Sequence, residues 1–245
     1  AGYLAWPALL VLGGLAAAAF AAKRGHANFV VRTFVHAALV TLAIGLAVHA
    51  MPGFNNPLLI ENFRFSSDAA PYTHHANFDK AAAGLFVLVF LCNRVRQAGE
   101  WRDLLLRTYP IALLTCTVVI ATGLAVGYSR PDFKLPAYTP VFLVVNLLFT
   151  CVAEEAFFRG FFQHRLAKYL QDRITHGNLV ALASCSVLFG VVHLGGGPWY
   201  IVLATCAGLG YGYAYLRTQR LEASILVHFC VNAVHFIGFT YPRLA

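Results

Sequence analysis

The chain contains eight apolar runs, each close to the twenty residues that an α-helix needs to cross a bilayer. Only 11% of its residues are charged, against roughly a quarter in an average soluble domain. The runs cover roughly residues 3–22, 33–51, 78–93, 110–128, 139–158, 178–194, 198–216 and 223–240. The sequence therefore predicts an all-α fold, a polytopic bundle of about eight transmembrane helices, and a single integral membrane domain over residues 1–245.

The third run is the weakest of the eight. Its uncharged core covers only residues 81–92, so we expect Lys80 and Arg94 at its ends to extend toward the two membrane surfaces. The long loop of residues 52–80 precedes it, and we interpret His74 and His75 in that loop as a solvated pair. Three further histidines lie in or near apolar runs without acidic neighbours in the sequence, and we interpret them as packing or interfacial residues: His36, His49 and His235.

The basic residues orient the bundle. With eight spans, 13 of the 18 lysine and arginine residues fall in loops on one side of the membrane. Because cytoplasmic loops are rich in Lys and Arg, that side is predicted to be the cytoplasm, with both termini outside. The net charge of +8 then fits contact with anionic headgroups of the bilayer, and no nucleic-acid partner is expected. We expect a multi-pass protein of the bacterial inner (plasma) membrane.

Two adjacent acids are the exception to this apolar pattern. Of the ten acidic residues, only Glu154 and Glu155 lie deep within an apolar run. An intramembrane carboxylate costs at least a few kcal/mol unless it is paired or hydrated, so such acids are functional candidates. Residues four apart share a helix face, which lets Arg159 hold Glu155 as a structural ion pair while Glu154 faces a polar cavity. The alternative is that all three lie at a helix end near the headgroups.

Two later runs carry polar pairs at helical spacing. Phe189 and His193 are four apart near the end of the sixth run, and His228 and Asn232 are four apart in the eighth. Such pairs also hold helices together in lipid, at about a kcal/mol each. Helix packing does not explain why two acids, two histidines and an amide occur together on three runs. We therefore predict one shared site, built by motifs within residues 150–240.

These segments resemble the CPBP family of intramembrane proteases, which includes type II CAAX prenyl endopeptidases and bacteriocin-processing (ABI) proteins. The resemblance rests on EEAFFR for the family's EExxxR, FGVVH for its FxxxH and HFCVN for its HxxxN, in the family's order. It implies that Glu154 and His193 activate a water molecule. It also implies that His228 and Asn232 stabilise the oxyanion of the tetrahedral intermediate.

The implied function is hydrolysis of a peptide bond in a membrane-anchored protein or peptide by a glutamic protease without a cofactor. Hydrolysis of an amide needs a base for water, donors aimed at the developing negative charge, and an acid for the leaving amine. The residues above include groups of each kind. Three further residues are expected to support the site without reacting: Glu155, Arg159 and Phe189.

Other functions are compatible with the same residues. Two glutamates and two histidines could present zinc with two oxygens and two nitrogens, namely Glu154, Glu155, His193 and His228. We favour a site without metal, because the HExxH pairing is absent and adjacent acids on a helix diverge. A non-catalytic immunity or scaffold protein would keep the polar cluster for packing, and a transporter would use it as a proton relay. The sequence does not define an oligomeric state.

Membrane depth is a difficulty for this site. The two acids lie beyond the centre of the fifth run, whereas His193 lies near the outer end of the sixth. Either the fifth helix extends through FRGFFQHRL, or tilted helices and the break at residues 195–197 bring His193 inward. A site opening outward suits an exported, membrane-anchored substrate, and one opening to the cytoplasm suits a prenylated CAAX protein. The predicted topology favours the former.

Overall fold

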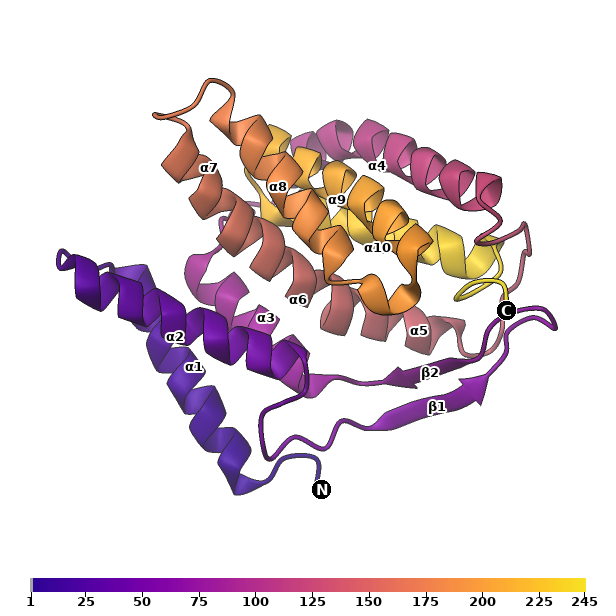
Figure 1. Ribbon diagram of the computed structural model, residues 1–245, viewed down its shortest axis with the longest axis horizontal. Helices are drawn as coiled ribbons and strands as arrows, with labels where there is room; N and C mark the ends of the chain where they lie inside the picture. The colour runs from indigo at the N-terminus through magenta and orange to yellow at the C-terminus, as the bar shows by residue number, and fades with distance from the viewer. Residues whose placement is uncertain (1) are drawn as a thin grey trace.

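The computed structural model describes residues 2–245, which form a helical bundle with one small antiparallel hairpin (Figure 1). In chain order the elements are α1 (Trp6–Arg24), α2 (Phe29–Ala47), β1 (Leu58–Phe63), β2 (Tyr72–His75), α3 (Phe78–Leu91), α4 (Glu100–Ala125), α5 (Thr139–Val145), η1 (Asn146–Cys151), α6 (Val152–Glu155), η2 (Ala156–Gln163), α7 (His164–Leu170), α8 (Gly177–Val191), η3 (Leu194–Gly196), α9 (Pro198–Thr218) and α10 (Leu221–Gly238). The segments from α5 to α7 form one continuous helix, Thr139–Leu170, which we name the central helix. A helix covers each predicted apolar run, and the predicted helical membrane bundle is confirmed.

The helices differ in whether they can cross a membrane alone. Within residues 2–245, five are long and apolar enough: α1, α2, α4, the central helix and α10. Helices α3 and α8 have 14 and 15 residues. At 1.5 Å per residue they are about 21 and 22 Å long, shorter than the hydrocarbon core of about 30 Å. An end of each can therefore lie within the membrane, and the prediction of eight full spans stays a prediction.

The segments predicted to lie outside the membrane meet at one end of the molecule. Isolated bridges join Leu4 to Phe54, Ala69 to Leu244 and Pro131 to Phe239. They connect the N-terminal segment, the hairpin region, the α4–α5 connection and the C-terminal tail, and Figure 1 shows the hairpin beside the C-terminus. This grouping agrees with the predicted order of crossings. Which membrane face the end occupies stays a prediction.

One prediction for the histidines in this region is wrong, and a second histidine has a partner that the sequence did not show. His74 lies on β2 and is only 9% exposed, with Nδ1 2.7 Å from the hydroxyl of Tyr138. Burial lowers the pKa of His74 to about 4, so the side chain is neutral at pH 7. Because it is buried, the side chain is not solvated. His49 does have an acidic neighbour, because its Nδ1 lies 2.7 Å from the carboxylate of Asp79. Asp79 is 30 residues away from His49 in sequence. The chain reverses from α2 through the hairpin into α3, and this places Asp79 beside His49.

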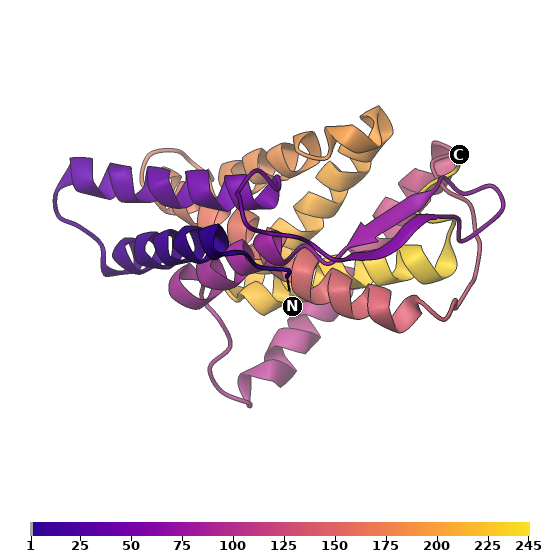
Figure 2. The same cartoon turned by 90° about the horizontal axis from the view of Figure 1, so that it is seen from below.

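The central helix lies between two apolar cores. One core is formed mainly with α1, α2 and α3, includes Leu15, Leu39 and Phe161, and extends to the ends of α9 and α10. The other is formed with α4, α8, α9 and α10 and includes Phe158 and Phe189. Figure 2 shows α1 and α2 together on one side of the bundle. The central helix therefore packs against both halves of the chain.

Gly84 allows α3 to approach the central helix closely. A Cβ at Gly84 would lie 2.2 Å from Cα of Ala153. We expect Gly84→Ala to lower the unfolding temperature in detergent, because overpacking costs about 1–3 kcal/mol and outweighs alanine's higher helix propensity. Gly13→Ala in α1 is the matched control, since its Cβ meets no described atom within 4 Å, and its unfolding temperature should stay or rise. Equal unfolding temperatures for Gly84→Ala and the unsubstituted protein would contradict this packing.

Candidate active site

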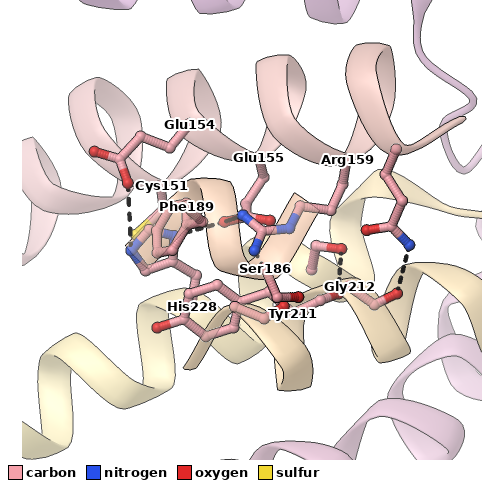
Figure 3. Close-up of polar contacts among 12 residues, drawn as sticks. Cys151, Glu154, Glu155, Arg159, Ser186, Phe189, Tyr211, Gly212 and His228 are labelled. Carbon is pink, nitrogen blue, oxygen red and sulfur yellow. Dashed lines mark hydrogen bonds and ion pairs between the residues drawn. The ribbon is translucent and has the colours of Figure 1, made fainter. Parts of the chain in front are cut away.

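The two adjacent glutamates occupy the short α-helical turn α6 of the central helix, between the π-helical stretches η1 and η2. π-helical turns are rare and frequently occur at functional sites. The carboxylates point in different directions, and Figure 3 shows Glu155 directed toward Arg159 while Glu154 points away. Glu155 is fully buried, and the side chain of Glu154 is 10% exposed. The two acids therefore have different surroundings, as the sequence analysis expected.

Glu155 joins two cationic or polar partners inside the protein. Its Oε1 lies 3.0 Å from NH1 of Arg159 and 2.8 Å from Nδ1 of His228. All three side chains are buried. Because a carboxylate accepts hydrogen bonds, Nδ1 of His228 donates, and its Nε2 is left to face Glu154. Glu155 therefore fixes the orientation of an imidazole that comes from α10.

Arg159 is completely buried, and besides Glu155 it contacts α8 and α9. Its NH2 donates to the carbonyl of Gly208 at 3.1 Å, and its guanidinium lies 4.5 Å from the ring centroid of Phe189. One turn later Gln163 donates to the carbonyl of Gly212 at 3.0 Å. The absence of side chains at Gly208 and Gly212 on α9 leaves room for these two long polar side chains.

His193 follows the C-terminal end of α8 and is held by its own motif. Its Nδ1 lies 2.6 Å from the carbonyl oxygen of Phe189, which can only accept, so Nδ1 carries a proton. The Phe189 ring is 3% exposed and packs edge-on against His228, with ring centroids 5.9 Å apart. The four-residue spacing of this pair thus directs Nε2 of His193 toward the central helix.

The two imidazoles converge on one oxygen. Nε2 of His193 and Nε2 of His228 each lie 4.0 Å from Oε2 of Glu154. This oxygen is buried and has no hydrogen-bond partner within residues 2–245. A separation of 4.0 Å is too long for a direct hydrogen bond but suits one bridging water molecule. The arrangement can therefore hold water against a carboxylate and two imidazoles.

The length of the central helix bears on the difficulty of membrane depth. The central helix continues through FRGFFQHRL to Leu170, so Glu154 lies at the middle of its 32 residues. Helix α8 is short and ends at Val191, which places His193 in the turn beyond it. The helix extension that the sequence offered as one explanation is therefore observed, and the depth of the site in a membrane stays a prediction.

Asn232 is held by an amide that sequence analysis missed. Its Nδ2 donates to Oδ1 of Asn146 at 3.1 Å, and that oxygen also accepts from Sγ of Cys151 at 3.2 Å. The same Nδ2 also lies 3.9 Å from Sγ of Cys151, a weak acceptor, so its second N–H is only weakly bound within the protein. The sequence feature that points to Asn146 is its position as a single amide within the apolar run VFLVVNLLF.

Lys80 also belongs to the site, and its predicted position at the membrane surface is wrong. Its Nζ lies 2.5 Å from Oε1 of Glu154. The lysine is near the start of α3. This helix packs against the central helix at Ala153, the residue before Glu154. A buried carboxylate within reach favours the ammonium there over a path to the headgroups.

Glu154 lies where two cavities meet. The larger, of about 1130 Å³, lies between α2, α3, the central helix and α8; its walls are mostly aliphatic and aromatic, and Arg32 and Arg165 also line it. The smaller, of about 390 Å³, is lined by Asn232, by both site histidines and by tyrosines from the hairpin end of the molecule. Glu154 and His193 line both cavities.

The predicted divergence of the acids bears on the zinc alternative. The carboxylate of Glu155 is directed to Arg159. It points away from Oε2 of Glu154, the oxygen that the two histidines face. Among the residues described, no group of three or more His, Cys, Asp or Glu side chains is arranged to hold a metal ion. A mechanism without metal stays a prediction.

One comparison with known proteins finds a family model that matches part of the chain. Residues 136–234 match the family model described as type II CAAX prenyl endopeptidase Rce1-like. The matched segment contains all three motifs and Asn146, whereas Lys80 precedes it. No curated protein and no solved structure gave a significant match.

Proposed function

We propose that the chain is a glutamic intramembrane endopeptidase. The premise is that residues 136–234 belong to the CPBP family through its Rce1-like group. The family match confirms the resemblance and supports an intramembrane protease that acts on membrane-associated peptides. The observation that carries the mechanism is the buried, unpartnered Oε2 of Glu154, which two imidazole Nε2 atoms face at 4.0 Å within the described residues.

Glu154 acts as the base in this proposal. A water molecule held between Oε2 of Glu154 and Nε2 of His193 gives its proton to the carboxylate, and its oxygen adds to the carbonyl carbon of the substrate. The hydrogen bond from Nδ1 of His193 to the Phe189 carbonyl leaves the Nε2 lone pair directed at that water. The proton then passes from Glu154 to the leaving amine as the C–N bond breaks.

His228 and Asn232 stabilise the tetrahedral oxyanion. The Asn232 amide contributes an N–H oriented by Asn146. When both nitrogens of His228 carry protons, Nδ1 donates to Glu155 and Nε2 is free to donate to the oxyanion. Donors fixed in advance in a buried site act more strongly than donors in water, because they need no reorganisation.

The two cavities suggest how a substrate lies across the site. The apolar cavity suits an apolar segment that enters from the bilayer beside α2, and the polar cavity suits the peptide that follows it. We propose that residues 1–245 form one membrane domain of the bacterial inner membrane with both termini outside. The polar cavity then opens outward, which favours an exported, membrane-anchored substrate.

The test is cleavage in proteoliposomes. Purified protein is reconstituted with internally quenched peptides that carry a transmembrane anchor, an S-prenyl anchor or no anchor. We expect cleavage of anchored peptides only, at a rate unchanged by a strong chelator. A folded protein that cleaves none of them would favour the immunity or scaffold alternative, and activity lost to chelator and restored by zinc would favour a zinc protease.

Asn232→Ala tests the oxyanion assignment. Removal of one such donor is expected to lower kcat by about 10²–10³-fold with little change in unfolding temperature. Asn93→Ala, the same change at an exposed position between α3 and α4, is the control and should cleave at the unsubstituted rate. An unchanged kcat in Asn232→Ala would remove this residue from the site.

A further inference from the structure

One charged group reaches the site from outside the matched segment. Lys80, on α3, places Nζ 2.5 Å from Oε1 of Glu154, and its side chain is 21% exposed. We propose that Lys80 is a positioning residue, which keeps Glu154 ionised and turns Oε2 toward the two imidazoles. This inference rests on the proposed function, because it concerns the base of that reaction.

The packing of α3 explains why Lys80 reaches this carboxylate. Lys80 and Gly84 are four apart, so they share one face of α3. Gly84 packs directly against Ala153, the residue before Glu154. The close contact at Gly84 therefore holds Lys80 over the next residues of the central helix. A larger separation between the two helices would take the ammonium out of hydrogen-bond range.

The neighbouring acid on α3 is occupied by other partners. Asp79 is 1% exposed and accepts from Nδ2 of Asn56 at 2.9 Å, and Nδ1 of His49 lies 2.7 Å from its second oxygen. Within residues 2–245, the only ion pair that Lys80 forms is with Glu154. The hydrogen bonds of Asp79 thus hold the start of α3 in place. The ammonium of Lys80 does not pair with Asp79 and pairs with Glu154 instead.

Lys80 is the basic side chain in direct contact with Glu154. The titratable groups that surround Glu154 are Lys80 from α3, Cys151 from η1, Glu155 from α6, His193 after α8, Tyr200 from α9 and His228 from α10. Nζ of Lys80 lies at hydrogen-bond distance from Oε1 of Glu154, whereas both imidazoles stay 4.0 Å from Oε2. A cation in direct contact favours the ionised form of a carboxyl group, which is the form that a general base needs.

The geometry favours positioning over inhibition. An inhibitory contact would cover the atoms that react. Lys80 contacts Oε1, and Oε2 stays directed at His193 and His228. The ammonium therefore occupies one oxygen of the base and leaves the other to water.

Carbodiimide labelling tests this role without a substrate. Dicyclohexylcarbodiimide reacts with a protonated carboxyl group, so the labelled fraction of Glu154, measured by mass spectrometry across pH, reports its protonation. In proteoliposomes, we expect Lys80→Met to move the midpoint of labelling up by about one pH unit or more. Lys80→Arg, which keeps the charge, and Lys168→Met at an exposed position of α7 should follow the unsubstituted protein. Superimposable curves for Lys80→Met and the unsubstituted protein would overturn the proposal.

Kinetics separate this inference from the proposed function. With an anchored peptide that the unsubstituted protein cleaves, Lys80→Met should move the acid limb of kcat/KM to higher pH, and Lys80→Arg should restore it. A higher kcat in Lys80→Met at every pH would identify Lys80 as an inhibitory contact and overturn the proposal. If no anchored peptide is cleaved at all, the proposed function fails, and the labelling result still decides whether Lys80 keeps Glu154 ionised.

Discussion

Glu154→Gln is expected to lower kcat for an anchored peptide by about 10²–10⁴-fold, because an amide of the same size cannot take a proton from water. The measurement is the rate of release of a quenched fluorophore in proteoliposomes at matched protein content. Glu61→Gln, the same change at an exposed position of β1, is the control and should leave the rate unchanged. A Glu154→Gln variant that cleaves at the unsubstituted rate would end the glutamic mechanism.

The same variant also probes the lysine. If Lys80 acts through Glu154, substitution of Lys80 should lower kcat little in a variant that already lacks the Glu154 carboxylate. The loss in kcat for Lys80→Gln combined with Glu154→Gln should therefore stay close to that of Glu154→Gln alone, since residues that act as one unit are not additive. Losses that multiply would show that Lys80 acts on another group.

Arg159→Met is expected to cost about 3–5 kcal/mol in the free energy of unfolding, the usual penalty for removing one member of a buried ion pair. The carboxylate of Glu155 would lose its guanidinium partner while still fully buried. The carbonyl of Gly208 would also lose the hydrogen bond that it accepts from Arg159. Reversible SDS titration of the reconstituted protein measures this free energy. A loss below about 1 kcal/mol would show that the pair is not a structural requirement.

A double variant separates stability from chemistry. Replacing both members of a buried ion pair by apolar residues is often nearly neutral, so Glu155→Leu with Arg159→Met should recover much of the lost stability. Cleavage should stay low, because His228 then lacks the carboxylate that accepts its Nδ1 proton. Recovery of kcat together with stability would show that Glu155 serves only the fold.

Contacts within one helix could be predicted from the sequence. Glu155 and Arg159 are four apart, and they form the expected pair at 3.0 Å. Phe189 and His193 are also four apart, and their spacing gives the hydrogen bond from imidazole to carbonyl. The period of the helix fixes such contacts, so they do not depend on which helices are neighbours.

Contacts between helices could not be predicted in this way. Lys80 and Glu154 are 74 residues apart, and His49 and Asp79 are 30 apart. No periodicity in the sequence states that α3 packs against the central helix at Gly84. The prediction that Lys80 extends to the membrane surface failed because it treated the third run as an isolated helix.

The sequence leaves the end of one helix open. The fifth apolar run ends at residue 158, and the extension through FRGFFQHRL that the sequence allows is the one observed, since the helix continues to Leu170. Arg159 and Gln163 on this extension are buried, and carbonyl groups of α9 accept hydrogen bonds from both. Hydropathy treats such residues as exposed, and only the neighbouring helix shows that they have hydrogen-bond partners inside the protein.

The π-helical stretches on either side of Glu154 have a consequence for its direction. The acid lies on a single α-helical turn whose orientation depends on how the backbone is wound before residue 152 and after residue 155. A π-helical turn holds more residues than an α-helical one. A substitution that tightens either stretch therefore rotates the carboxylate relative to both imidazoles, although no reacting side chain has changed.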